Sequence, residues 1–156
     1  MARKTEVDML ALHMIPDDAA LDEIVAKELA ALGMPERRKG CLYLRDMVAR
    51  VVVWNEPKFP KMEELYAEAA KRYGVDARNV QQVVSRAVGA AVDGMPPAQI
   101  DAYFQSGGVA AKGGVSCRNY CQLAVRRVRQ TIMEQAADDA ALGKAGCRHW
   151  QRFYLR

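Results

Sequence analysis

One stretch of the chain, from Tyr66 to Arg86, constrains the fold more than any other. Its residues predict a helix, a tight turn at Gly74 and a second helix. Gly suits that turn because it has no Cβ and readily adopts the left-handed conformation that ends a helix. Val75 is expected to fill the corner, and the carboxylate of Asp76 is placed to cap the second helix. This order of elements is the helix-turn-helix arrangement.

The second helix of this motif has two distinct faces. Apolar side chains at 3.6-residue spacing predict its buried face: Val80, Val83, Val84, Ala87, Val88 and Ala91. The opposite face carries side chains of the kinds that hydrogen-bond base edges and phosphates: Arg78, Asn79, Gln81, Gln82, Ser85 and Arg86. It contains no acidic residue, which favours DNA as a partner, since phosphates repel carboxylates. On pattern alone, an ordinary helix pair with a solvated polar face is the alternative.

The composition is that of a folded protein built mainly from helices. The chain has 156 residues, of which 51% are hydrophobic and 27% charged, enough for one domain with a core. Aromatic residues make up only 7%, while Ala and Val are abundant, which favours closely packed helices. The net charge of +4 permits nucleic-acid binding without establishing it. Because no apolar run approaches the length of a signal or membrane segment, we expect a cytoplasmic protein with reduced thiols.

Apolar periodicity and helix-breaking residues predict six helices. They run from about residue 17 to 33, 36 to 54, 62 to 73, 77 to 92, 96 to 104 and 116 to 142. The first helix includes Glu28 in its inner stripe. The second is apolar over a broad arc, which predicts a central position in the bundle; its inward residues would be Leu42, Leu44, Met47, Val48, Val51, Val52 and Trp54. Gly40 lies inside that helix at a cost of about 1 kcal/mol relative to Ala, so we expect a close helix crossing there.

These elements together predict an all-α fold. The expected architecture is a six-helix bundle with an embedded helix-turn-helix, winged-helix-like but without a sheet. Its expected boundaries are an N-terminal arm at 1–16, a helical DNA-binding domain at 17–142 and a basic aromatic tail at 143–156. We expect the tail to dock on the core through Trp150, Phe153 and Leu155 with its arginines outward; binding to DNA, anionic lipid or a partner subunit is the alternative.

The block from Leu32 to Arg45 resembles the signature of a known family. It reads Leu-Gly-Met-Pro-Glu-Arg-Arg-Lys-Gly-Cys-Leu-Tyr-Leu-Arg. The family is the C-terminal effector domain of stage zero sporulation protein A, a sporulation response regulator. The residues that match its signature are Gly33, Pro35, Lys39, Gly40, Leu42, Tyr43, Leu44 and Arg45. The resemblance covers roughly residues 20 to 130 and implies a six-helix, effector-type domain that binds DNA as head-to-tail copies on tandem sites.

The chain also departs from that family. The family domain follows a phospho-accepting receiver domain, whereas only a short arm precedes it here, so we do not expect control by aspartyl phosphorylation within this chain. The polar face of the second motif helix carries fewer basic residues than in the family. Because Gln reads adenine and Arg favours guanine, we expect a changed base preference and a weaker attraction to phosphates. The tail beyond about residue 130 has no counterpart in the family.

We therefore expect a sequence-specific, DNA-binding transcription regulator whose helix 77–92 enters the major groove of double-stranded DNA, as a homodimer or as tandem copies. Gln81, Gln82, Ser85 and Arg86 would read bases, with Arg78 and Asn79 on bases or phosphate. The candidate phosphate contacts are Lys39, Lys71, Arg72 and Lys112, although Lys39 also fits a structural role in the signature block. The alternative is a protein-interaction module derived from a helix-turn-helix that no longer binds DNA, which the less basic helix favours.

Other kinds of site receive little support from the sequence. A zinc site would need the widely spaced set Cys117, Cys121, Cys147 and His149. Structural zinc sites use tighter knuckles, so we expect no metal. The Gly-rich segment 107–114 lacks the spacing of a phosphate-binding loop and reads as a connector. No nucleophile–base motif or carboxylate pair stands out, which predicts neither an enzyme nor a cofactor.

Overall fold

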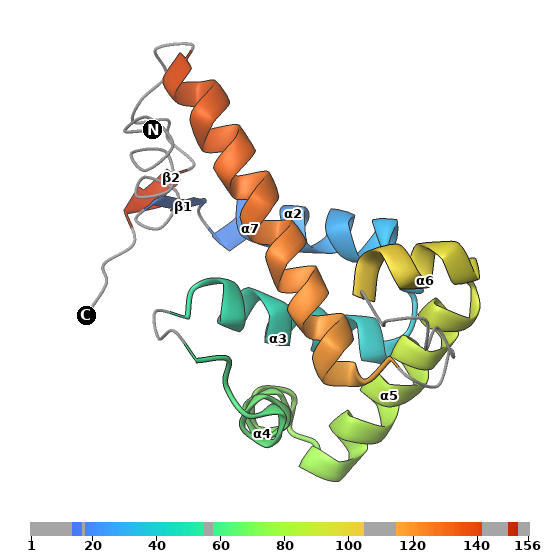
Figure 1. Cartoon of the computed structure of the whole chain (residues 1–156). Coiled ribbons are helices and arrows are strands. Elements are labelled where there is room, and N and C mark those ends of the chain that lie inside the picture. Colours follow the sequence, from blue (N-terminus) through green and yellow to red (C-terminus); the bar gives the residue numbers. More distant parts are fainter. Residues whose placement is uncertain (1–13, 17, 55–57, 105–114, 142–149, 153–156) are drawn as a thin grey trace.

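The computed structural model describes residues 14–16, 18–54, 58–104, 115–141 and 150–152. Six helices lie within these ranges: α2 (Asp18–Ala31), α3 (Lys39–Val52), α4 (Met62–Tyr73), α5 (Ala77–Asp93), α6 (Pro97–Phe104) and α7 (Cys117–Ala141). They confirm the predicted all-α fold, and their bounds follow the predicted ones closely (Figure 1). None of these helices combines the length and the apolar character needed to cross a membrane.

The prediction that the chain has no sheet is wrong in one detail. Two three-residue strands, β1 (Met14–Pro16) and β2 (Trp150–Arg152), pair antiparallel. They lie beside α7, on the side of the molecule away from α4 and α5 (Figure 1). The pairing links a segment assigned to the arm with one assigned to the tail. Three residues are too few for an alternating pattern to show in the sequence, which is why the strands were missed.

The central helix of the bundle is α3, which packs against α2, α4, α5 and α7 (Figure 1). Leu44, Met47 and Val48 on its inner side are fully buried, as its broad apolar arc predicts. Leu42 is a correction, because 43% of it is exposed. Two residues along an α-helix correspond to a rotation of about 200°, so Leu42 lies on nearly the opposite side of α3 from Leu44.

Gly40 brings α3 and α5 into unusually close contact, as its position inside a helix predicts. A Cβ at Gly40 would lie 2.5 Å from the Cβ of Ala87 and 2.6 Å from the main-chain oxygen of Val83. Val83 itself is only partly buried, since it sits at the edge of this crossing. The absence of a side chain at Gly40 therefore sets how closely α5 approaches the centre of the bundle.

Hydrogen bonds from Arg127, Arg129 and Thr131 fasten α7 to α2 and α3. The Arg129 guanidinium donates to the main-chain oxygen of Val51 at 2.7 Å, and so satisfies a carbonyl at the C-terminal end of α3. Glu28, which lies in the inner stripe of α2 as expected, accepts hydrogen bonds from Arg127 at 3.1 Å and from Thr131 at 3.2 Å. A largely buried carboxylate is tolerated there because it is paired and hydrogen-bonded.

Two glycine substitutions test the crossing of α3 and α5. We expect Gly40→Ala to lower the free energy of unfolding by about 1–3 kcal/mol, because the new methyl group collides with main-chain atoms of α5. Gly89→Ala is the matched control, since a Cβ at Gly89 meets nothing within 4 Å. That change should raise the free energy of unfolding by up to about 1 kcal/mol. Urea titrations measure the free energy of unfolding of both variants. Equal changes of the same sign in the two variants would contradict the close crossing.

Candidate nucleic-acid interface

The turn between α4 and α5 forms as the sequence predicts, with one correction. Gly74 ends α4 in the left-handed conformation, at φ 65° and ψ 35°. The main-chain N–H of Val75 then donates to the oxygen of Ala70 at 3.0 Å, which closes the turn. The side chain of Val75 does not fill the corner, because 37% of the residue is exposed. The left-handed glycine and the main-chain hydrogen bond form this turn without a buried side chain.

The start and the inner side of α5 are fixed by local contacts. The Asp76 carboxylate accepts a hydrogen bond from the main-chain N–H of Arg78 at 3.4 Å, which confirms the predicted cap. The inner side of the helix is buried: Val80, Val84, Ala87, Val88, Ala91 and Val92. With one side locked into the core, α5 presents a defined set of side chains outward.

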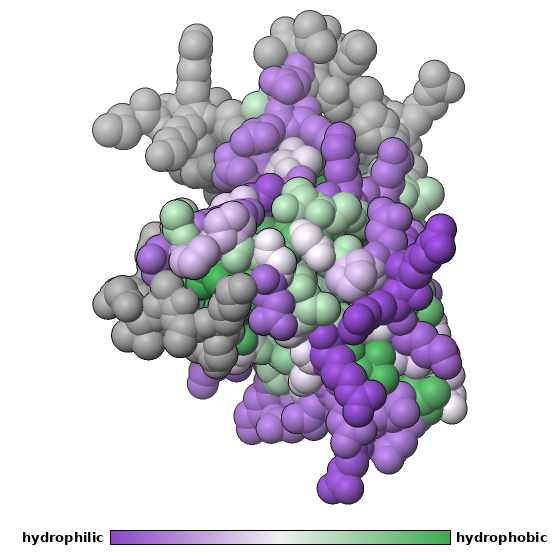
Figure 2. Space-filling view, turned by 90° about the vertical axis from the view of Figure 1, so that its right-hand side faces the viewer, coloured by the Kyte–Doolittle hydropathy of each residue, from purple (hydrophilic) through white to green (hydrophobic). Residues whose placement is uncertain are grey.

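All six residues predicted to face outward from α5 are exposed: Arg78, Asn79, Gln81, Gln82, Ser85 and Arg86. Five of them, all except Asn79, line one shallow hollow of about 440 Å³. Figure 2 turns the α5 side of the molecule toward the viewer, and the lower part of this face is mainly hydrophilic. The structure therefore gathers the predicted base-reading residues on one surface; their role stays a prediction.

The charges on this surface are available to a partner. Within the part of the chain that the structure describes, neither Arg78 nor Arg86 forms an ion pair. Ser85 differs from its neighbours, because its hydroxyl oxygen lies 3.4 Å from the sulfur of Cys117 on α7. This contact places the first turn of α7 at one edge of the α5 surface.

The four predicted phosphate contacts fall into different surroundings. Lys39 is exposed at the first residue of α3, next to the glycine that touches α5. Lys71 is exposed in the last turn of α4. Arg72 forms an ion pair with Asp46, so its position is explained without a ligand. Lys112 lies outside the described residues.

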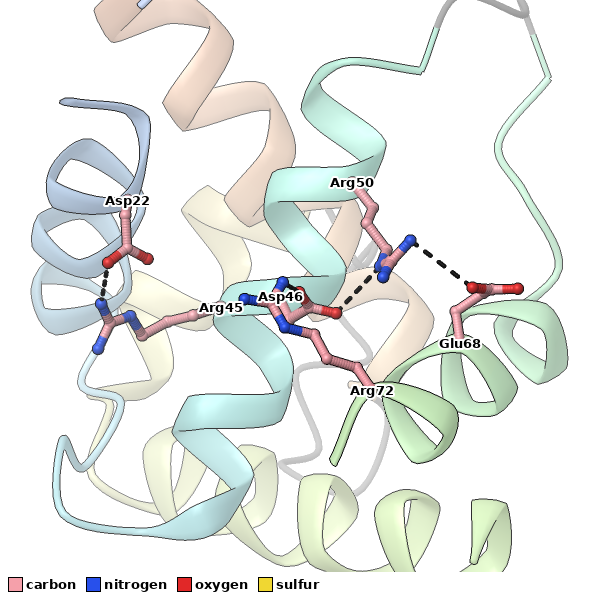
Figure 3. Close-up of polar contacts among 6 residues, drawn as sticks. All are labelled: Asp22, Arg45, Asp46, Arg50, Glu68 and Arg72. Carbon is pink, nitrogen blue, oxygen red and sulfur yellow. Dashed lines mark hydrogen bonds and ion pairs between the residues drawn. The ribbon is translucent and has the colours of Figure 1, made fainter. Parts of the chain in front are cut away.

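The ion pair of Arg72 belongs to a network that joins α4 to α3 (Figure 3). The side chain of Asp46 is only 5% exposed, and it also accepts a hydrogen bond from Arg50 at 3.0 Å. Arg50 in turn lies 3.7 Å from Glu68 on α4. Two cations thus compensate one buried carboxylate, which favours a structural role for Arg72.

The cysteines show no sign of a metal site in the described part of the chain. No group of three or more metal-binding side chains comes together there. Cys41 and Cys121 are buried, and burial raises the pKa of both thiols, that of Cys121 to about 12. They are therefore protonated at neutral pH and poor metal ligands. Cys147 and His149, the other candidates, lie outside the described residues.

Sequence reasoning missed one cation at this surface. Arg118 is exposed in the first turn of α7, directly after the cysteine that contacts α5. Its guanidinium carbon lies 5.1 Å from the centre of the Phe59 ring. One local signal in the sequence indicated that Arg118 has no ion-pair partner within its own helix. Residue 122, one turn further along, is Gln and not an acidic residue. The closeness of the first turn of α7 to α5 depends on tertiary packing and could not be predicted from the sequence.

Comparison with known proteins identifies the fold family. A family model described as "Sporulation initiation factor Spo0A C terminal" matches residues 25–132, which is more than half of the chain. The match includes the helix-turn-helix of α4 and α5 and the block around Gly40 that carried the resemblance. A search of curated proteins found no match. The chain belongs to the Spo0A C-terminal family, whose members are DNA-binding effector domains of a sporulation response regulator.

Proposed function

We propose that this protein is a sequence-specific transcription regulator that reads the major groove of DNA with α5. The observation that carries the proposal is the outward face of α5, where two glutamines and two arginines, neither in an ion pair with any described residue, surround one shallow hollow. The major groove is about 12 Å wide and admits an α-helix, and these side-chain types can bond to base edges within it. Membership of a family of DNA-binding domains supports the same partner.

Within this proposal the residues have different roles. The side-chain amides of Gln81 and Gln82 can form paired hydrogen bonds with adenine, and the guanidinium of Arg86 can do so with guanine. Arg78 and Asn79, near the start of α5, reach bases or the adjoining phosphate. Ser85 lies at the edge of the reading face, because its hydroxyl group already contacts a thiol of α7. Specificity therefore comes mainly from the two glutamines and Arg86.

The phosphate contacts are proposed for exposed cations without a partner among the described residues. Lys39 and Lys71 meet this condition, whereas Arg72 is assigned to the ion pair with Asp46. Such contacts orient the protein on the duplex and carry no sequence information of their own. They also make the affinity depend on salt, because each one releases counterions from the DNA.

A selection from a pool of random duplexes tests the proposal directly. The 156-residue protein is used to enrich bound DNA, and affinity for the enriched site is then measured at two salt concentrations. The proposal predicts one recurring site and an affinity that falls steeply as salt rises. If no duplex is enriched, the chain is better described by the alternative, a protein-interaction module with a helix-turn-helix scaffold.

Replacing Arg86 tests base reading at one position. Arg86→Ala should weaken binding to the selected site by about 1–3 kcal/mol and relax the preference at one base pair, if the guanidinium reads a guanine. Fluorescence anisotropy against a set of single-base variants of the site measures both effects. Arg126→Ala, an exposed arginine on α7, is the control and should leave the preference unchanged. An unchanged base preference in the Arg86 variant would remove this residue from the reading face.

Substitutions of two neighbouring cations on α4 distinguish phosphate binding from structural support. We expect Lys71→Met to leave the stability unchanged and to reduce the salt dependence of binding. The slope of log affinity against log salt concentration should fall by about one. Arg72→Met should instead destabilise the fold by about 1 kcal/mol, because Asp46 loses one of its two cationic partners. Its salt slope should match that of the unaltered protein. Salt titrations and urea unfolding of both variants provide the test; the reverse pattern would assign Arg72 to DNA.

A further inference from the structure

The starts of two helices flank the exposed face of α5. On one side, Gly40 at the beginning of α3 contacts Val83 and would clash there if it had a side chain. On the other side, Cys117 at the beginning of α7 lies 3.4 Å from Ser85. Val83 and Ser85 are two residues apart, which is about 200° around the helix. The starts of α3 and α7 therefore border the α5 surface on opposite sides.

Each of these borders carries an exposed cation. Lys39 precedes Gly40 on the α3 side, and Arg118 follows Cys117 on the α7 side. Neither side chain forms an ion pair with any acidic group among the residues that the structure describes. A helix lying in the major groove has one sugar-phosphate strand on each side of it. Lys39 and Arg118 thus lie next to the two helix starts that border the α5 surface, where these strands would pass.

Two other arginines of α7 have structural roles that Arg118 does not share. Arg127 pairs with Glu28 of α2, and Arg129 donates to the main-chain oxygen of Val51. Arg118 has no such partner among the described residues, where its guanidinium contacts the ring of Phe59. Removal of its positive end would therefore break no hydrogen bond of the fold described here.

The ring of Phe59 supports the Arg118 guanidinium. The guanidinium carbon lies 5.1 Å from the centre of the ring, within the range of a cation–π interaction. Phe59 is itself partly buried against the core, so it forms a stable support. A guanidinium stacked on a ring keeps the N–H donors at its edge free to bind. A side chain already held in place also loses less conformational entropy when it binds a ligand.

We propose that Arg118 binds a phosphate of duplex DNA on the strand that passes the Ser85 side of α5, opposite the strand that Lys39 meets. This inference rests on the proposed function, because it requires α5 to lie in the major groove. Phosphate contacts on both strands fix the rotation of the reading helix in the groove. Arg118 is thus a positioning residue: it sets the orientation in which the α5 side chains meet the bases and reads no base itself.

The test compares Arg118→Gln with Arg126→Gln. Residues 118 and 126 are both exposed arginines on α7, but residue 126 is nine positions from Cys117, about 180° around the helix and more than two turns away. Affinity for the selected duplex is measured in the full chain across a range of salt concentrations. We expect Arg118→Gln to weaken binding about tenfold, the effect of losing one hydrogen bond to a charged group. Its log–log salt slope should fall by about one, and Arg126→Gln should match the unaltered protein.

A second measurement locates the contact on the DNA. Duplexes with one neutral methylphosphonate at each successive position show which phosphates the protein needs. The unaltered protein should lose about tenfold in affinity at one phosphate to which Arg118→Gln has become insensitive. Arg118→Lys should recover part of that sensitivity, since it restores the charge. The base preference found by random-site selection should be the same for all these variants.

The possible failures can be told apart. If the unaltered protein enriches no duplex, both the proposed function and this inference fail. If the unaltered protein binds a specific site but Arg118→Gln has the same affinity, salt slope and phosphate sensitivity, the inference alone is overturned. It is also overturned if Arg118→Gln weakens binding while the pattern of sensitive phosphates stays unchanged. A lower urea midpoint in that variant would then assign Arg118 to the fold.

Discussion

The close crossing of α3 and α5 at Gly40 is the contact on which the rest of this structure depends. A methyl group there would lie 2.6 Å from a main-chain oxygen of α5, so only glycine allows the present spacing. The crossing seats the inner side of α5 against the central helix and leaves its polar side exposed. It also brings the start of α3, with Lys39, to one edge of that polar surface. One glycine thus links packing in the core to the presentation of the reading face.

Two groups among the arginines differ in their surroundings. Arg50, Arg72 and Arg127 pair with carboxylates that are largely removed from water, and they hold helices together. Arg78 and Arg86 are exposed without an ion pair in the described chain, and both lie on α5. Burying a carboxylate without a cation is costly, so the first group is required by the fold. Arg78 and Arg86 are therefore among the cations left to attract an anionic partner.

Much of the fold could be predicted from the sequence, because helix ends and apolar spacing are local properties. Residues such as Gly74 and Asp76 act on their own turn, and both behave as expected. The errors have two causes, helix rotation and tertiary arrangement. Leu42 was assigned to the core by its apolar character, although its rotation around α3 turns it outward. The partner of Arg72 lies 26 positions away in the chain, and the place of Arg118 beside α5 follows only from the contact of its neighbour Cys117 with Ser85. Local patterns gave the surface of α5, and three-dimensional contacts were needed to sort the cations around it.

The most direct test of the central claim is to observe the side chains of α5 while DNA is added. NMR spectra of the side-chain amides report on Gln81 and Gln82, and the amide of Gln130 on α7, bonded to Glu134 at 3.1 Å, serves as an internal reference. Base reading by α5 predicts that the selected duplex shifts the two α5 amides and leaves Gln130 unchanged. Specific binding with shifts confined to other helices, and none on α5, would contradict it.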